Sequence, residues 1–134
     1  MKKVDAPDAE FGTHAARILK GAKDRGMITS IDMVSEESDR VRSVVLPALK
    51  FTDICCINES EAHAITGTEL VEDGVISPER TALALREIHR LGVSKWVVIH
   101  SPRCSYGYDA ENDTLVRVES LKLPAGYIKG TTGA

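Results

Sequence analysis

Two short runs of apolar residues constrain the fold of this chain more than any other feature. Ile54-Cys55-Cys56-Ile57 and Trp96-Val97-Val98-Ile99 contain no charged residue, so a strand made from either run is apolar on both faces. Such strands are typical of the centre of a parallel sheet. Segments with helical apolar spacing precede and separate them. This alternation predicts a three-layer α/β fold with a mostly parallel sheet and helices on both faces.

The helical segments carry recognisable start and stop signals. We expect helices over about 8–24, from Ser35 or Ser38 to about 51, over 59–66, and over 77–92. Ser77 followed by Pro78 is typical of an N-cap and a first helical position. A glycine can stop the third helix at residue 67. Pro47 predicts a kink or a break within the second helix.

The remaining apolar segments predict strands and one hairpin. We expect strands over 27–34, 53–58 and 96–99, and a more polar hairpin made of 106–108 and 115–118. The hairpin turns at Asn112-Asp113 and closes one edge of the sheet with antiparallel pairing. At 134 residues and 43% hydrophobic content, the chain has the size of a single domain.

Composition excludes several classes of partner. The net charge of −3 is made of interspersed charges of both signs, so there is no basic surface for nucleic acid and no cationic stretch for a membrane. No apolar run approaches the length of a membrane span and no signal-peptide core follows Met1, so we expect a cytoplasmic protein. The three cysteines are interpreted as reduced, structural residues.

Polar residues follow the two central strands, at the edge where open α/β sheets bind ligands. Asn58 and Glu61 place an amide and a carboxylate where they could hold Mg²⁺ through water; the alternative is helix capping. His100 and Ser101, with Arg103 nearby, could contact phosphate or ribose. For this second segment the alternative is a turn built around a proline.

A third candidate is Asp32, at the end of the first expected strand, for which the alternative is that it satisfies backbone groups of a neighbouring loop. A fourth candidate lies at the C-terminal Gly-Thr-Thr-Gly-Ala, residues 130–134. Glycines let backbone N–H groups approach an anion, and a helix that began there would add the positive end of its dipole. The alternative is a frayed tail of small residues.

Taken in order, these segments resemble the ribokinase-like carbohydrate kinases of the phosphofructokinase-B type. The segment 53–67 resembles the strand and helix that carry the family's Asn-x-x-Glu motif, matched here by Asn58 and Glu61. The segment 95–104 resembles the strand and turn on which the nucleotide lies. Residues 130–134 resemble the signature Asp-Thr-Thr-Gly-Ala-Gly-Asp up to its fifth position, with Gly130 in place of the first aspartate.

The resemblance implies phosphoryl transfer from ATP, with Mg²⁺, to a hydroxyl of a sugar or sugar-like molecule. It implies that Gly133 and Ala134 begin the anion hole. It also implies nucleotide contacts, with Mg²⁺ at Asn58 and Glu61. The residues implied to bind the cofactor are Asn58, Glu61, His100, Ser101, Thr131 and Thr132.

The resemblance also implies that residues 1–134 form a partial domain. The family's N-terminal sugar and lid part, its C-terminal adenine-site helices and the aspartate that acts as general base have no counterpart in the chain. We therefore expect an inactive fragment of a kinase. The alternative is a noncatalytic nucleotide- or anion-binding module, or a self-associating one. Because truncation exposes apolar surface, we expect a homo-oligomer.

Overall fold

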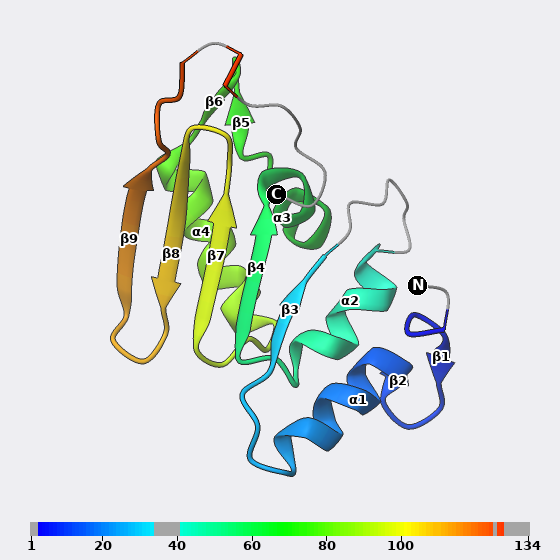
Figure 1. Cartoon of the computed structure of the whole chain (residues 1–134). Helices are drawn as coiled ribbons and strands as arrows, with labels where there is room; N and C mark the ends of the chain where they lie inside the picture. The colour runs from blue at the N-terminus through cyan, green and yellow to red at the C-terminus, as the bar shows by residue number, and fades with distance from the viewer. Residues whose placement is uncertain (1–2, 34–40, 125, 128–134) are drawn as a thin grey trace.

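A five-stranded sheet forms the centre of the protein (Figure 1). The computed structural model describes residues 3–33, 41–124 and 126–127. The strand order is β3-β4-β7-β8-β9, in which the first three strands are parallel and the last two pairings are antiparallel. The strands are β3 (Ser30–Asp32), β4 (Ile54–Asn58), β7 (Trp96–His100), β8 (Cys104–Asp109) and β9 (Thr114–Glu119). The predicted α/β sheet with an antiparallel edge is confirmed.

Four helices accompany the sheet in the described part of the chain: α1 (His14–Lys23), α2 (Val41–Leu49), α3 (Glu59–Thr66) and α4 (Pro78–Arg90). The last two match their sequence signals closely. Asn58 caps α3, and Gly67 ends it with a left-handed φ of 74°. Ser77 caps α4, whose first residue is Pro78. None of the described helices has the length and apolarity that a membrane span requires.

The helices α3 and α4 contact one face of the sheet. Cys55, Ile57, Val97 and Ile99 point to this face and are completely buried. The opposite face carries Trp96, which is 51% exposed. None of the described helices covers that face of the sheet (Figure 1). The sequence predicts helices on both faces. The chain instead moves in one direction from β3 to β4 to β7, so right-handed crossovers place the connecting helices on a single side.

The N-terminal helix begins later than its apolar spacing predicts. Asp8 accepts hydrogen bonds from the backbone N–H groups of Glu10 and Phe11, which forms a turn in place of the first helical residues. A two-residue hairpin made of β1 (Pro7–Asp8) and β2 (Gly12–Thr13) occupies this segment. Thr13 then caps α1, because its hydroxyl accepts a hydrogen bond from the backbone N–H of Ala16.

Two further boundaries differ from the predictions. The strand expected over 27–34 has only three residues in β3, and α2 ends two residues after Pro47. The expected caps at Ser35 and Ser38 lie outside the described residues. A second short hairpin, made of β5 (Val71–Glu72) and β6 (Val75–Ile76), was not predicted. Its turn residues have φ values of 51° and 74°, which suit an Asp-Gly dipeptide.

Candidate functional site

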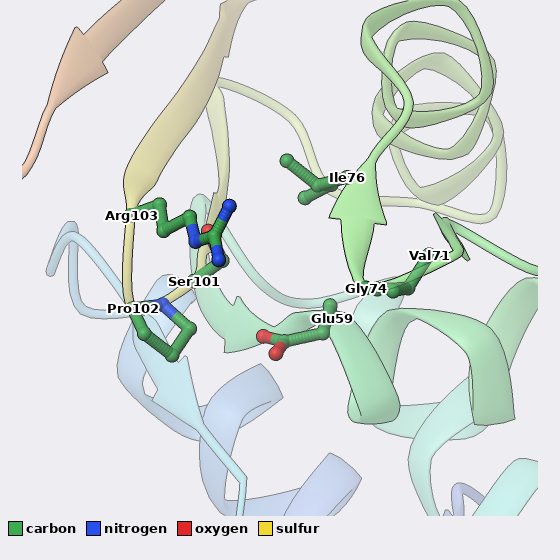
Figure 2. A pocket seen from close by; sticks show the side chains of 7 residues that line it. All are labelled: Glu59, Val71, Gly74, Ile76, Ser101, Pro102 and Arg103. Atoms are coloured by element: carbon green, nitrogen blue, oxygen red, sulfur yellow. The ribbon is translucent and has the colours of Figure 1, made fainter.

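A small pocket lies at the carboxyl ends of β4 and β7 (Figure 2). Its volume is about 170 Å³. Three segments line it: the first residue of α3, the turn after β7, and the β5–β6 hairpin. The lining residues are Glu59, Val71, Gly74, Ile76, Ser101, Pro102 and Arg103. Since β4 and β7 are adjacent parallel strands, the sheet itself brings these segments together at the edge where open α/β sheets bind ligands.

Opposite charges face each other across this pocket. Figure 2 shows the Arg103 guanidinium and the Glu59 carboxylate pointing into the pocket from opposite walls. The Arg103 side chain is exposed and makes no ion pair with any residue that the structure describes. A guanidinium presents several donors in a planar fork, which suits the oxygens of a phosphate group. The pocket therefore offers an anion a cationic partner.

The turn after β7 is closed by its own hydrogen bonds. The Ser101 hydroxyl donates to the carbonyl oxygen of Cys104 at 2.8 Å, and the backbone N–H of Ser101 donates to the same oxygen at 2.9 Å. The backbone N–H of Cys104 donates back to the Ser101 hydroxyl at 3.3 Å. The proline-turn alternative thus describes the local geometry, and it presents Ser101 to the pocket with its hydroxyl proton already engaged.

Asn58 and Glu61 form a capping box at the start of α3. The Asn58 side-chain oxygen accepts from the backbone N–H of Glu61, and the Glu61 carboxylate accepts from the backbone N–H of Asn58, both at 2.9 Å. Glu61 is only 4% exposed. The capping alternative is therefore present in the structure. The expected Mg²⁺ role of the two residues stays a prediction.

The described residues contain no group of three or more His, Cys, Asp or Glu side chains placed to hold a metal ion. Protein sites for Mg²⁺ often use only one or two carboxylates, together with water and substrate phosphates. Glu59, in the pocket wall, offers one such carboxylate. A site with a single protein carboxylate suits Mg²⁺ that arrives with a phosphate better than Mg²⁺ alone.

The structure brings only some of the predicted site residues together. Ser101 lines the pocket, whereas His100 is exposed at the end of β7 and is the register partner of Asn58. Neither of those two residues, nor Glu61, lines the pocket. The predicted residues Thr131, Thr132, Gly133 and Ala134 lie outside the described residues.

Sequence reasoning placed Arg103 beside the expected phosphate contacts and Glu59 in the polar corner after β4, but it missed the β5–β6 hairpin as a wall of the pocket. For the hairpin the only signal was the Asp73-Gly74 dipeptide, which predicts a turn but does not say where the turn packs.

The cysteines do not contribute reactive groups to this site. Burial, with smaller contributions from the neighbouring Cys56, Glu61 and Asp32, raises the pKa of the Cys55 thiol to about 12. Burial also raises the pKa of Cys56. All three cysteines are free thiols, and the two with raised pKa values stay protonated and unreactive at neutral pH.

Solved structures match the fold, although no protein-family model and no curated protein matches the sequence. Arabidopsis thaliana ribokinase complexed with ribose and ATP matches with a TM-score of 0.67 and 22% identity, over 89% of this chain and 34% of that one. The ADP complex of Bacillus subtilis pyridoxal kinase matches with a TM-score of 0.62 and 20% identity, over 87% and 45%. The tetrameric inhibited form of phosphofructokinase-2 from Escherichia coli matches with a TM-score of 0.59 and 21% identity, over 78% and 31%.

These likenesses show the fold. The chain has the ribokinase-like α/β fold, and the resemblance read from the sequence is confirmed at that level. It spans about a third to a half of the length of the solved structures that it matches.

Proposed function

We propose that this chain forms part of the nucleotide-binding region of an ATP-dependent carbohydrate kinase. In such an enzyme a phosphoryl group passes from ATP to a hydroxyl of a sugar or sugar-like molecule. The observation that carries the proposal is the pocket at the carboxyl ends of β4 and β7, with Arg103 facing into it. The chain shares its fold with kinases whose structures contain ADP or ATP.

The size of the pocket indicates which part of a nucleotide it takes. A volume of about 170 Å³ is below the roughly 300–1,000 Å³ of sites that enclose a whole small-molecule ligand. It suits a phosphate group, held by Arg103 through charge-assisted hydrogen bonds. We place the rest of the nucleotide outside this pocket, and the expected contacts of His100, Thr131 and Thr132 stay predictions.

The residues around the pocket also suit a magnesium nucleotide. When bound, Mg²⁺ neutralises charge on the phosphates. The anion hole that we expect to begin at Gly133 and Ala134 would stabilise the charge that develops on the transferred group. Glu59 holds a carboxylate at the pocket wall. The expected contributions of Asn58 and Glu61, which form the cap of α3 outside the pocket lining, stay predictions. The role of this chain is to orient the phosphates.

Titration of the purified chain with ADP and Mg²⁺, followed by calorimetry, tests the proposal. We expect saturable binding that Arg103→Ala weakens about tenfold or more, because a hydrogen bond to a charged group contributes roughly 1.5–3 kcal/mol. Arg90→Ala is the matched control, since Arg90 is an exposed arginine at the far end of α4, paired with Glu87. Equal affinities for the native chain and Arg103→Ala would contradict the proposal.

A turnover assay tests whether the chain is inactive, and a comparison of ADP with inorganic phosphate separates the kinase proposal from a noncatalytic anion-binding module. We propose that the purified chain does not phosphorylate sugars, because the described pocket is too small for donor and acceptor together. ATP, Mg²⁺ and a panel of pentoses, hexoses and nucleosides would be supplied, and phosphorylated product measured. Turnover with any acceptor would reject this inactivity. Inorganic phosphate bound as tightly as ADP would favour the anion-binding module.

A further inference from the structure

The strand β9 forms an open edge of the sheet. All six of its residues are exposed, and within the described chain it pairs with β8 alone. Figure 1 shows it as the orange strand at the left edge, with no element beyond it. An exposed edge of this length presents a row of peptide groups that can pair with another strand.

The register of the hairpin decides which peptide groups are available. The backbone N–H of Ser120 donates to the carbonyl oxygen of Arg103 at 2.9 Å, and the β8–β9 register continues from that pair. Hydrogen-bonded and non-hydrogen-bonded pairs alternate along an antiparallel ladder. The backbone N–H and C=O groups of Val116 and Val118 therefore point toward β8. Those of residues 115, 117 and 119 point to the open edge.

We propose that β9 pairs with β9 of a second copy of this chain, antiparallel, around a twofold axis at Val118. Arg117 of each copy then lies opposite Glu119 of the other, and these two pairs exchange the outward-pointing peptide hydrogen bonds. The two five-stranded sheets become one continuous sheet across the axis. The proposal places the homo-oligomer expected from the sequence at a defined surface, and it does not depend on nucleotide binding.

Side-chain chemistry selects this register. Arg117 already pairs with Glu119 of its own chain, with 2.5 Å between Nη1 and Oε1. In the proposed register Arg117 faces Glu119 of the second copy, and Glu119 faces its Arg117. The four charges therefore alternate in sign around the axis. Opposite charges facing each other across strands are stabilising.

Apolar neighbours fit the same register. Val118 meets Val118 of the second copy on the other face of the sheet, and Val118 is 61% exposed in the single chain. Leu115, 41% exposed, falls opposite Leu121 of the second copy, which is 88% exposed. Pairing therefore buries the side chains that the open edge leaves in water.

The nearest alternative register is disfavoured. A shift that places the axis at Arg117 sets Arg117 directly against Arg117 of the second copy, and like charges directly opposite each other are destabilising. Charged residues on edge strands commonly prevent pairing. On β9 the two charges have opposite signs two residues apart, so they are complementary in the proposed register.

Charge reversal followed by sedimentation equilibrium tests the pairing. We expect the native chain, without nucleotide, to reach twice its 14.6 kDa mass as concentration rises. Arg117→Glu alone should weaken dimerisation at least tenfold, because four like charges then meet at the axis. The double variant Arg117→Glu with Glu119→Arg restores the alternation and should restore the dimer. A native chain that stays monomeric, or a double variant that dimerises no better than the single one, would overturn the proposal.

Cysteine cross-linking tests the register directly. Val118→Cys places two thiols in a non-hydrogen-bonded pair with Cα atoms about 4.5 Å apart, within the range of a disulfide. Val116→Cys is the matched control, because residue 116 of one chain lies four positions along the strand from residue 116 of the other, a separation of about 13 Å. Mild oxidation should link Val118→Cys into a dimer much faster than Val116→Cys or the native chain. Equal rates for the two variants would overturn the register.

Discussion

The Nζ atom of Lys23, at the end of α1, lies 2.5 Å from Oδ1 of Asp53, which directly precedes β4. The Asp53 side chain is only 5% exposed. Its carboxylate also accepts hydrogen bonds from the Ser94 hydroxyl at 2.6 Å and the Thr29 backbone N–H at 2.9 Å. One side chain thus joins α1 to the segments that begin β3, β4 and β7. This junction lies at the amino ends of the strands, opposite the pocket.

Removing the Asp53 carboxylate should therefore destabilise the whole sheet. We expect Asp53→Ala to lower the free energy of unfolding by about 3 kcal/mol, since it leaves a buried network without its acceptor. Asp24→Ala removes the exposed Lys20–Asp24 pair and should cost less than about 1 kcal/mol. Urea unfolding followed by circular dichroism measures both. Similar losses for the two variants would show that Asp53 does not organise the strands.

Acid should weaken the fold partly through the same carboxylate. Burial acts to raise the pKa of Asp53, but hydrogen bonds from Lys23, Ser94 and Thr29 outweigh it and hold the pKa well below its usual range. Because the folded pKa is the lower one, the contribution is complete above about pH 4 and is lost as pH falls toward the folded pKa. Urea midpoints measured from pH 6 down to pH 2.5 should fall more steeply below pH 4 for the native chain than for Asp53→Asn. Parallel curves would contradict this assignment.

Gly92, after α4, should tolerate no side chain. Its φ is 138°, and a Cβ atom there would lie 2.7 Å from Cα of Lys50 and 2.8 Å from the Lys50 backbone nitrogen. We expect Gly92→Ala to cost about 3 kcal/mol or more, from backbone strain and overpacking together. Gly67→Ala is the control: its φ is 74° but nothing lies within 4 Å, so only about 1–2 kcal/mol of strain applies. Thermal unfolding compares them, and equal losses would rule out the close approach to Lys50.

The parts of the fold that sequence predicted are those with local signals. The runs that became β4 and β7, the Asn58 and Ser77 caps and the Gly67 stop are each specified within a few residues. The start of α1 was missed because the turn at Asp8 competes with helical spacing over the same residues. The uncovered face of the sheet depends on the direction of successive crossovers, which no single segment specifies.

The candidate site was predictable in position more than in composition. Strand ends indicate the edge of the sheet at which the pocket lies, yet one wall of the pocket is a hairpin whose packing no local pattern encodes. Long-range contacts explain other omissions in the same way. The partners of Asp53 lie 24, 30 and 41 residues away along the chain, so their meeting is a property of the tertiary fold.

Asn58 allows capping and ligand binding to be separated. Aspartate is as good an N-cap as asparagine, so Asn58→Asp should leave the free energy of unfolding within about 0.5 kcal/mol of the native value, whereas Asn58→Ala should lower it by about 1 kcal/mol. The added negative charge at the strand end should still weaken ADP binding about fivefold, through repulsion of the phosphates. Urea unfolding and calorimetric titration with ADP and Mg²⁺ measure the two effects on the same variants. Unchanged ADP affinity in Asn58→Asp would mean that this residue only caps α3, and a stability loss equal to that of Asn58→Ala would mean that the cap depends on the amide itself.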